Sequence, residues 1–447
     1  MILLMEQIGE DAANLIYSLD TADYAYEAVS INYDGFLPDG AVSPYAYYVF
    51  GGRDTPDEPV KPLYFDRLPV PALWEIESSN NSGELFDYEQ LRARIFYATP
   101  KENRFVRIVD WLDKNGKVRF SDHYDKYGKF FARTVLDRNQ KPVHKSYFDR
   151  QGREVITENL LTGDIILTEK GRNAFFHTKS DFVVHFLTHS GRKLDRVLFN
   201  SLSVPFFASE KLRVKRPELT RNVLFWQEPI GDDIPGNMKT ILEGGTGGVE
   251  TIAVQKKDAA EKIRRLPVDQ KRFCPLGYIY PHERTNTGTA QALIFTNSDQ
   301  LEKLGELADA LPEVQFHIGA ITEMSSKLMA FEPRPNVTLY PTIEDPTVKK
   351  LWNRCDLYLD INHGGEILSA VRTAFVYDQL IFGLEGTLHN RRFTAPENIF
   401  TPDNYGAMAD RIRAVLHDGE EMKRALTAQR EHAFAASAED YRRVLGQ

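Results

Sequence analysis

Asp113-Lys-Asn-Gly-Lys117 begins a pattern that returns three times along the chain, as Asp125-Lys-Tyr-Gly-Lys129, Asp137-Arg-Asn-Gln-Lys141 and Asp149-Arg-Gln-Gly-Arg153. The four aspartates are spaced 12 residues apart. An Asp that opens a tight turn, with Gly three residues later, is common turn chemistry, because the Asp side chain accepts hydrogen bonds from nearby amides and Gly tolerates a positive φ. Each repeat therefore predicts a turn that joins two strands.

The segments between the turns are rich in Val, Ile, Thr, Phe and Tyr, which favour strands: residues 118–124, 130–136, 143–148 and 154–160. We predict a β-meander of at least four strands, which residues 164–168 and 182–187 extend. An open meander has unpaired amides at its edges and a face that must be covered. An oligomeric partner would solve both problems; the alternative is a solvated sheet attached to one domain.

On both sides of the repeat, short apolar runs alternate with helical stretches. Before residue 270 the runs are 182–187, 223–226 and 251–254, with a helix at 258–266. Further on, strands are predicted at 292–295, 314–317, 337–340, 357–361 and 380–382, with helices at 299–311, 346–354 and 366–377 and more helices up to the C-terminus. This alternation predicts parallel sheets covered by helices on both faces.

Two α/β halves with an inserted β segment are thus the predicted architecture. The first half comprises residues 1–45 and 181–270, the insertion residues 46–180, and the second half residues 271–429. We expect the helices of residues 430–447 to return to the first half.

The composition is that of an ordinary folded protein of more than one domain. Of the 447 residues 42% are hydrophobic and 27% are charged, and the net charge is −9. These values exclude a disordered chain and a general nucleic-acid-coating protein. Residues 101–180 hold 17 Lys and Arg against 11 Asp and Glu, a balance of +6, so the remaining residues sum to −15. Residues 101–180, in the inserted segment, therefore differ in charge from the rest of the chain.

Cysteine usage and the absence of an apolar leader point to a cytoplasmic location. Cys274 and Cys355 are too few for a disulfide scaffold or a cysteine-based zinc site. The N-terminus lacks a basic region with a long apolar run, and no apolar run is long enough to span a membrane. We expect a cytoplasmic protein that needs no cofactor or metal ion. The sequence does not decide whether the protein associates peripherally with the cytoplasmic face of the cell membrane. No amphipathic segment stands out as an anchor.

Two glycine clusters suggest ligand loops, and they differ in polarity. The cluster Gly244-Gly-Thr-Gly-Gly248 follows a helical stretch, which is the wrong polarity for a phosphate loop and favours a linker or helix stop. The cluster Asn362-His-Gly-Gly-Glu366 follows the strand at 357–361 and precedes a predicted helix. That polarity suits a ligand at the carboxyl end of a parallel sheet, although a tight strand-to-helix turn explains the glycines equally well.

Several segments resemble a known bacterial family: Asp34-Gly-Phe-Leu-Pro-Asp39, Val70-Pro-Ala-Leu-Trp-Glu-Ile76, Val109-Asp-Trp-Leu-Asp113, Asn200-Ser-Leu-Ser-Val-Pro-Phe206 and Trp226-Gln-Glu-Pro-Ile-Gly-Asp-Asp-Ile-Pro-Gly-Asn-Met238. This is the GtfB family, the stabilising B subunits of the two-component protein O-GlcNAc transferases that modify serine-rich-repeat adhesins in streptococci and lactobacilli. The resemblance covers nearly the whole chain. It implies an α/β fold of the GT-B glycosyltransferase type, with two Rossmann-like domains and an extended antiparallel β-sheet domain inserted in the first.

The resemblance also permits a test for catalysis. Related retaining enzymes carry a Glu in the strand-to-helix turn of the second domain and another eight residues on, which contact the donor sugar and ribose, and cations that neutralise the diphosphate. Here His363 and Val371 occupy the two Glu positions, and the alternative register pairs Glu366 with Ala374. Asn297 stands where active relatives have Arg, with Lys303 only approximately in place of a second cation. We therefore expect a glycosyltransferase fold that has lost donor chemistry.

The resemblance implies a complex with a catalytic A subunit, in which this chain stabilises the enzyme and binds the Ser/Thr-rich adhesin for O-linked GlcNAc addition. We expect the inserted sheet to contact that subunit. The cleft between the two halves is the default groove for the acceptor. Its candidate residues are Asn286, Thr287, Asn297, Asn362, His363 and Glu366, with no catalytic residue and no metal ligand among them.

Two other functions stay open from the sequence. One is an active retaining glycosyltransferase that uses a UDP-sugar donor through an atypical donor site. The other is a stand-alone lectin-like module. For each candidate residue, the alternative is a surface or capping role without a ligand.

Overall fold

The computed structural model describes residues 1–79, 81–244 and 248–446. The chain divides into two compact units. Unit 1 comprises Met1–Val254, Lys262–Cys274 and Val444–Gln447, and unit 2 comprises Gln255–Glu261 and Pro275–Arg443.

Unit 1 contains a seven-stranded sheet in the order β17-β16-β15-β14-β1-β2-β3, in which β16, β15, β14, β1, β2 and β3 pair in parallel. Its strands are β1 Ile2–Met5, β2 Glu27–Ser30, β3 Ala41–Val42, β14 Val197–Phe199, β15 Asn222–Trp226, β16 Val249–Val254 and β17 Phe273–Pro275. The helices of this part of the chain are α1 Glu10–Thr21, α2 Pro44–Val49, α3 Lys179–His189, α4 Val204–Lys215 and α5 Gly236–Leu242. Helix α6 Lys257–Ile263 follows β16, and its residues up to Glu261 belong to unit 2. Strands β1, β14 and β15 are completely buried, as expected for a parallel sheet between helix layers.

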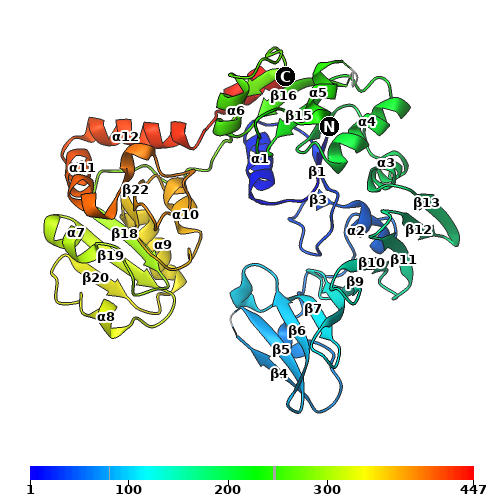
Figure 1. Ribbon diagram of the computed structural model, residues 1–447, viewed down its shortest axis with the longest axis horizontal. Helices are drawn as coiled ribbons and strands as arrows, with labels where there is room; N and C mark the ends of the chain where they lie inside the picture. Colours follow the sequence, from blue (N-terminus) through cyan, green and yellow to red (C-terminus); the bar gives the residue numbers. More distant parts are fainter. Residues whose placement is uncertain (80, 245–247, 447) are drawn as a thin grey trace. The chain divides into compact units, whose positions relative to one another are not determined.

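The inserted segment forms a ten-stranded sheet, hereafter the extended sheet, whose strands follow one another in chain order from β4 to β13 (Figure 1). The strands are β4 Trp74–Ser78, β5 Ser82–Asp87, β6 Gln90–Tyr97, β7 Val106–Leu112, β8 Val118–Tyr124, β9 Phe130–Leu136, β10 Pro142–Phe148, β11 Glu154–Asn159, β12 Ile165–Glu169 and β13 Arg172–Phe176. Short 3-10 turns lie at Phe65–Arg67 and Lys101–Asn103. The predicted meander is confirmed, and β8 and β9 have the bounds that the repeat predicts.

The four turns of the repeat share one geometry. In each turn the Asp side chain accepts hydrogen bonds from the amides two and four residues later, as Asp113 does from Asn115 and Lys117 at 2.8 and 3.1 Å. The position three residues after the Asp has φ between 65° and 77°. It is Gly in the first, second and fourth turns and Gln140 in the third turn. The Gln140 amide compensates by donating to the Val118 carbonyl and accepting from the Val118 N–H at 2.9 and 2.8 Å.

The turns alternate in their surroundings. The Asp125 and Asp149 side chains are buried, whereas residues 114–116 and 138–140 of the other two turns are exposed. The Lys126 N–H donates to Gly35 of the loop after β2 at 2.8 Å. Arg150 pairs with Asp125 at 2.7 Å and lies over the ring of Phe50, just after α2. Alternate turns therefore fasten the extended sheet to the rest of unit 1.

The strand predicted at residues 182–187 is wrong. These residues lie in helix α3, which begins after Thr178, whose hydroxyl accepts a hydrogen bond from the Asp181 N–H. The run Phe182-Val-Val-His-Phe-Leu187 is apolar without a period of two, so it fits a buried helix as well as a buried strand. The meander ends instead with β13.

Unit 2 contains a six-stranded parallel sheet in the order β20-β19-β18-β21-β22-β23. Its strands are β18 Gln291–Thr296, β19 Gln315–Ala320, β20 Val337–Tyr340, β21 Leu357–Asp360, β22 Leu380–Leu384 and β23 Ile399–Phe400. The helices are α7 Leu304–Ala310, α8 Ser326–Met329, α9 Asp345–Arg354, α10 Ala370–Val376, α11 Tyr405–His417, α12 Gly419–His432 and α13 Ala438–Leu445, with 3-10 turns at Pro396–Asn398 and Pro402–Asn404. Residues of β18, β19, β21, β22, α7, α11 and α12 share one hydrophobic core.

Two helices of unit 2 begin later than predicted. Helix α7 begins at Leu304 rather than 299, and α10 begins at Ala370 rather than at Glu366. Lys303, Leu368 and Ser369 have positive φ, which an α-helix does not accommodate. The residues before each helix therefore form loops, and the glycine cluster at 362–366 does not open a helix directly.

The last residues of the chain contact the parallel sheet region of unit 1. Tyr24 donates its hydroxyl to the Gly446 carbonyl at 2.6 Å, and Arg196 donates to the Leu445 carbonyl at 2.9 Å. Among the described residues, no helix is both long and apolar enough to cross a membrane.

Candidate functional site

The carboxyl ends of β18, β21 and β22 lie at one edge of the unit 2 sheet, because these strands are parallel neighbours. The loops that follow them, residues 297–303, 361–369 and 385–398, form the candidate site. Four of the predicted residues lie in these loops: Asn297, Asn362, His363 and Glu366. In open parallel sheets, ligands bind at this edge.

Backbone hydrogen bonds join the first two loops. The His363 N–H donates to the Gln300 carbonyl at 3.0 Å, and the Glu302 N–H donates to the Ile361 carbonyl at 2.8 Å. The buried side chain of Asn362 accepts a hydrogen bond from the Gly364 N–H at 2.9 Å and lies 2.8 Å from the Thr296 hydroxyl. The two loops are thus held together as a short antiparallel bridge between positions 301 and 362.

The side chain of Asn297 fills the space beside the glycine cluster. A Cβ atom on Gly364 would clash with the Asn297 amide oxygen and lie 2.9 Å from the Cβ of Ser298. The glycine at 364 is therefore explained by close packing between the two loops. The other glycine cluster gives no comparable information, because Gly245-Thr-Gly247 lies outside the described residues.

The charged candidates have partners within the same loops. His363 Nε2 lies 2.6 Å from a carboxylate oxygen of Glu302. Glu366 accepts a hydrogen bond at 2.9 Å from the N–H of Val371 in the first turn of α10. Glu366 therefore caps a helix, and a carboxylate at this end also interacts favourably with the helix dipole. Lys303 Nζ pairs with Glu306 at 3.2 Å, and this contact raises the pKa of Lys303.

His389 is a central residue of the site that the sequence analysis missed. Its Nδ1 lies 2.5 Å from the Asp360 carboxylate, and its Nε2 lies 2.7 Å from the Gly364 carbonyl oxygen. Both partners are acceptors, so both ring nitrogens must donate, and the imidazolium form satisfies them. Burial lowers the pKa of His389, but the bonds to Asp360 and Gly364 outweigh it and the pKa is raised. A charged His389 therefore holds the glycine loop onto the end of β21.

The signal that could have found His389 is its place after a strand. It lies in the loop after β22, as Asn297 and Asn362 lie after β18 and β21. Asp360 is 29 residues away in the chain, and no spacing rule connects the two.

Asn286 and Thr287 lie at the opposite edge of the sheet from the other four candidates. They precede β18 and bind groups at the amino end of β21. Asn286 donates to the carbonyls of Asp356 and Asp378 at 2.9 and 2.8 Å, and the Thr287 hydroxyl donates to the Asp356 carboxylate at 3.0 Å. The hydrogen bonds and the Arg284 guanidinium outweigh the effect of burial and lower the pKa of Asp356. The structure therefore does not bring the six candidates together.

Two of the segments that carry the family resemblance meet at the carboxyl edge of the unit 1 sheet, after β14 and β15. Asn200 donates to the Gln227 side chain at 2.9 Å, and the Ser201 hydroxyl donates to Glu228 at 2.7 Å. Asn237 completes the contact by donating to the Leu202 carbonyl at 2.9 Å. Residues 226–238, the longest segment that carries the resemblance, are thus hydrogen-bonded to the loop at 200–202.

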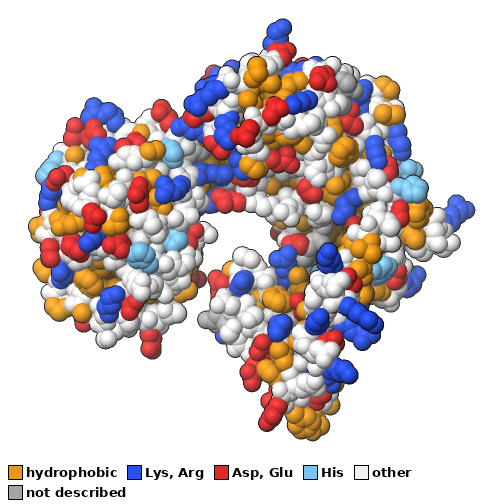
Figure 2. All heavy atoms as spheres, in the orientation of Figure 1, with side chains coloured by type: hydrophobic (Ala, Val, Ile, Leu, Met, Phe, Trp, Pro, Cys, Tyr) orange, Lys and Arg blue, Asp and Glu red, His pale blue; other side chains and the backbone are white. Residues whose placement is uncertain are grey.

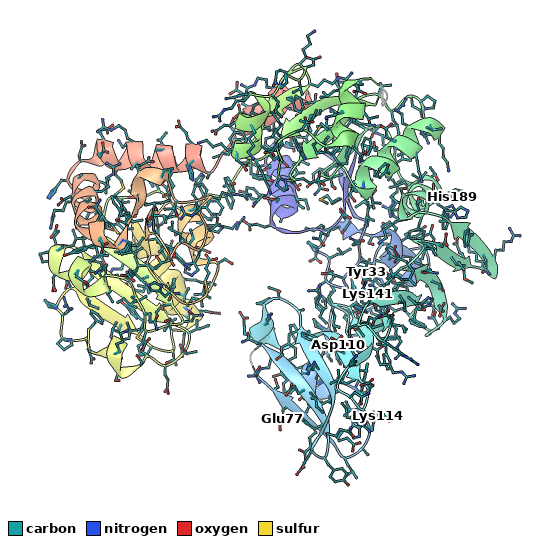
Figure 3. The ribbon with its side chains drawn as sticks, in the orientation of Figure 1. Tyr33, Glu77, Asp110, Lys114, Lys141 and His189 are labelled. Carbon is teal, nitrogen blue, oxygen red and sulfur yellow. The ribbon has the colours of Figure 1, made fainter. Side chains whose placement is uncertain are left out.

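The extended sheet offers a second candidate site of a different kind, a surface. Lys and Arg side chains gather over it in Figure 2, and Figure 3 labels Glu77 on the edge strand β4 and Lys114 and Lys141 in the exposed turns. Near the β4 edge, Leu73 and Tyr88 are 82% and 80% exposed. Exposed edge strands with apolar side chains are typical of interaction surfaces. Across the residues that the structure describes, no group of three or more His, Cys, Asp or Glu side chains is placed to hold a metal ion.

Comparison with family models covers most of the chain. Residues 2–48 match the GtfB N-terminal domain, 74–177 the GtfB middle domain, 179–266 the GtfB third domain and 292–429 the GftB/GlyA-F C-terminal domain. A curated relative from Streptococcus agalactiae, named UDP-N-acetylglucosamine–peptide N-acetylglucosaminyltransferase stabilizing protein GtfB, is 40% identical over 100% of this chain and 99% of its own.

Solved structures agree in fold. A chain of a GtfA/B complex bound to UDP and GlcNAc is 38% identical, with a TM-score of 0.92 over 99% of this chain and 98% of its own. The pneumococcal O-GlcNAc transferase GtfA, in complex with UDP and GlcNAc, is 11% identical with a TM-score of 0.54 over 99% of this chain and 98% of its own. The likeness to GtfA shows the glycosyltransferase fold alone: two Rossmann-like domains with an inserted antiparallel sheet.

Proposed function

Since the chain belongs to the GtfB family, we propose that it is the stabilising, non-catalytic subunit of a two-component protein O-GlcNAc transferase. In this role it assembles with a catalytic A subunit and binds the Ser/Thr-rich acceptor polypeptide. The names of its relatives support the stabilising role, and the match to a GtfA/B complex supports the partner.

The observation that carries the non-catalytic part of the proposal is the closed pair of loops at the carboxyl edge of the unit 2 sheet. Asn297 packs against Gly364, His363 contacts Glu302, and Glu366 caps α10. A donor diphosphate needs preorganised cations and amides that are available to it. Here the side chains at the corresponding positions form contacts with other residues of the same loops. This supports a loss of donor binding.

The extended sheet is the proposed contact surface for the catalytic subunit. It has two edge strands, β4 and β13, and residues 101–180, which form most of it, carry a surplus of positive charge that the rest of the chain lacks. Apolar side chains at the β4 edge supply area for burial, and the charge supplies orientation. A subunit that covers this edge would also protect it from aggregation.

Asn297, His363 and Glu366 make contacts within the loops and are also exposed, and the acceptor site is proposed at this exposed surface of the loops. A disordered, repetitive polypeptide binds weakly at each position. A second binding site next to the catalytic subunit therefore raises the effective concentration of acceptor between transfers. The cytoplasmic location and any association with the cell membrane stay predictions.

Co-purification followed by activity assays tests the proposal. We expect the chain and the catalytic subunit to elute as one species, with a mass by light scattering above that of either alone. The chain alone should not transfer GlcNAc from UDP-GlcNAc to a serine-rich peptide, whereas the complex should. Turnover by the chain alone would overturn the non-catalytic role, and a chain that stays monomeric beside the catalytic subunit would favour a lectin-like module.

Substitutions in the loops test the acceptor site. In the complex, His363→Ala with Glu366→Gln should weaken acceptor binding and modification, while His417→Ala, at the exposed end of α11, serves as the control. Unchanged acceptor affinity and unchanged modification in the double variant would show that the acceptor binds elsewhere.

A further inference from the structure

Unit 2 contains a cavity of about 680 Å³ that none of the roles proposed above uses. It is lined by Gln255, Lys256, Lys257, Asp258, Glu261, Tyr278, Tyr280, Arg391, Arg392, Pro396, His432, Ala433 and Phe434. Its volume lies within the range of small-molecule sites. The lining comes from the start of α6, the segment before β18, the loop after β22 and the end of α12.

The apolar part of the cavity is rigidly built. Residues 277–280 cross residues 433–436, with hydrogen bonds from the Tyr278 N–H to the Phe434 carbonyl and from the Ala436 N–H to the Tyr278 carbonyl at 3.3 and 2.8 Å. The Tyr280 hydroxyl donates to the Ala433 carbonyl at 3.2 Å. A Cβ on Gly277 would collide with the Phe434 carbonyl, so this crossing requires glycine. The aromatic wall is therefore fixed before any ligand binds.

The charged part of the cavity is mainly positive. Four lining side chains carry a positive charge, Lys256, Lys257, Arg391 and Arg392, and two carry a negative charge, Asp258 and Glu261. Within the described ranges, no carboxylate forms an ion pair with Lys257 or Arg391; Lys257 instead donates to the Glu431 carbonyl at 3.3 Å. His432 Nε2 lies 2.9 Å from the Arg391 carbonyl and joins the loop after β22 to the end of α12.

Because Lys257 and Arg391 line the same concavity and form no ion pair with a carboxylate of the described residues, their charges repel one another unless an anion compensates them. We propose that this cavity binds a phosphate-bearing ligand with an apolar or aromatic body. The phosphate contacts Lys257 and Arg391, whose charges lack a carboxylate partner, and the body packs against Tyr278, Pro396 and Phe434. Arg and Lys are the side chains that bind phosphate most effectively. The source of the phosphate is a soluble metabolite or a lipid headgroup, and both present the same chemistry.

Titration of the full-length chain with 1-naphthyl phosphate tests the proposal, with 1-naphthol and inorganic pyrophosphate as probes of the two parts. We expect 1-naphthyl phosphate to bind more tightly than either. The double variant Lys257→Glu/Arg391→Glu should weaken its binding at least ~10-fold, which corresponds to the loss of about 1.4 kcal/mol. Added salt should weaken binding to the unmodified chain.

The matched control is Lys423→Glu/Arg424→Glu, which makes the same change in net charge on the exposed side of α12. It should leave the affinity unchanged, and thermal unfolding verifies that both variants fold. The proposal fails if both double variants lose affinity equally, if 1-naphthol binds as tightly as its phosphate, or if 1-naphthyl phosphate shows no saturation up to ~1 mM.

Vesicles distinguish the two sources. Co-sedimentation with phosphatidylcholine vesicles that contain phosphatidylglycerol, lost in Lys257→Glu/Arg391→Glu and absent with pure phosphatidylcholine, identifies a lipid phosphate. Binding of 1-naphthyl phosphate without co-sedimentation identifies a soluble ligand. The measurement needs no catalytic subunit, so its outcome is independent of the proposed function.

Discussion

The turns at Asp125 and Asp113 share a sequence pattern and a backbone geometry, but they differ in what surrounds them. The Asp125 turn packs against the loop after β2 and the segment at 61–63, whereas residues 114–116 are exposed. The local pattern therefore determines the shape of a turn, while its contribution to stability depends on tertiary contacts that the pattern does not contain. Four sets of substitutions test this difference, from the largest expected effect to the smallest.

Asp125→Ala should have the largest effect. It removes the 2.7 Å partner of Arg150, whose side chain is 11% exposed, and leaves only Glu58 at 3.6 Å. Loss of one member of a buried ion pair costs about 3–5 kcal/mol. Asp137→Ala removes the same two turn hydrogen bonds at an exposed turn and should cost about 1 kcal/mol. Urea unfolding measured by the fluorescence of Trp74 and Trp111, both in the extended sheet, gives the two values. Equal losses would contradict the division of the turns.

Gly128→Ala and Gly116→Ala separate conformation from contact. Both positions have φ near 76°, so each variant strains the backbone by about 1–2 kcal/mol. A Cβ at 128 also lies 2.5 Å from the Lys61 carbonyl, whereas a Cβ at 116 has no atom within 4 Å. We expect Gly128→Ala to lower the free energy of unfolding by about 3 kcal/mol or more in all, and Gly116→Ala by no more than the strain. A difference below ~1 kcal/mol would show that the segment at 61–63 moves away easily.

Gln140→Gly should change the free energy of unfolding very little. Glycine removes the strain of a φ of 65°, but the substitution also loses the two exposed hydrogen bonds to Val118. Each effect amounts to about 1 kcal/mol with opposite sign. Gln140→Ala keeps the strain and loses the hydrogen bonds, so it should be the less stable variant in the same unfolding measurement.

The smallest effect is a pH dependence at Asp113. The N–H groups of Lys117 and Asn115 lower the pKa of this carboxyl below its ordinary value of 3.8. A lowered pKa in the folded state means that the stabilisation is present above pH 3.8 and is lost as the pH falls through the lowered pKa. Asp113→Asn should flatten the corresponding part of a stability profile between about pH 2 and 5. An unchanged slope would mean that the turn hydrogen bonds do not distinguish the charged form.

Much of the extended sheet could be predicted from the sequence, because its information is local. Strands β8 and β9 follow from the spacing of their turns. The run at 182–187 failed because its apolar residues fit two kinds of structure, and burial in tertiary contacts selected the helix. The start of α10 was misplaced because nothing in the sequence indicates that Leu368 and Ser369 adopt positive φ.

The candidate site was less predictable, because its contacts join residues far apart in the chain. Asn362 and His363 were found from the strand they follow, but Asn286 and Thr287 were grouped with them because the sequence does not distinguish the two ends of a strand. His389 was missed because its partner Asp360 belongs to another strand-loop unit. The domain limits and the residues that bind the acceptor stay predictions.

Because fastened and exposed turns alternate, the length of the extended sheet can change only by whole pairs of strands. Neighbouring strands are spaced about 4.8 Å apart, so each added hairpin of two strands would lengthen the sheet by about 10 Å. An insertion of 24 residues keeps every later turn on its own side, whereas an insertion of 12 would exchange the fastened turns for the exposed ones. Insertions or deletions that keep the fastened turns in place therefore change the length of the extended sheet by about 10 Å, or a multiple of it.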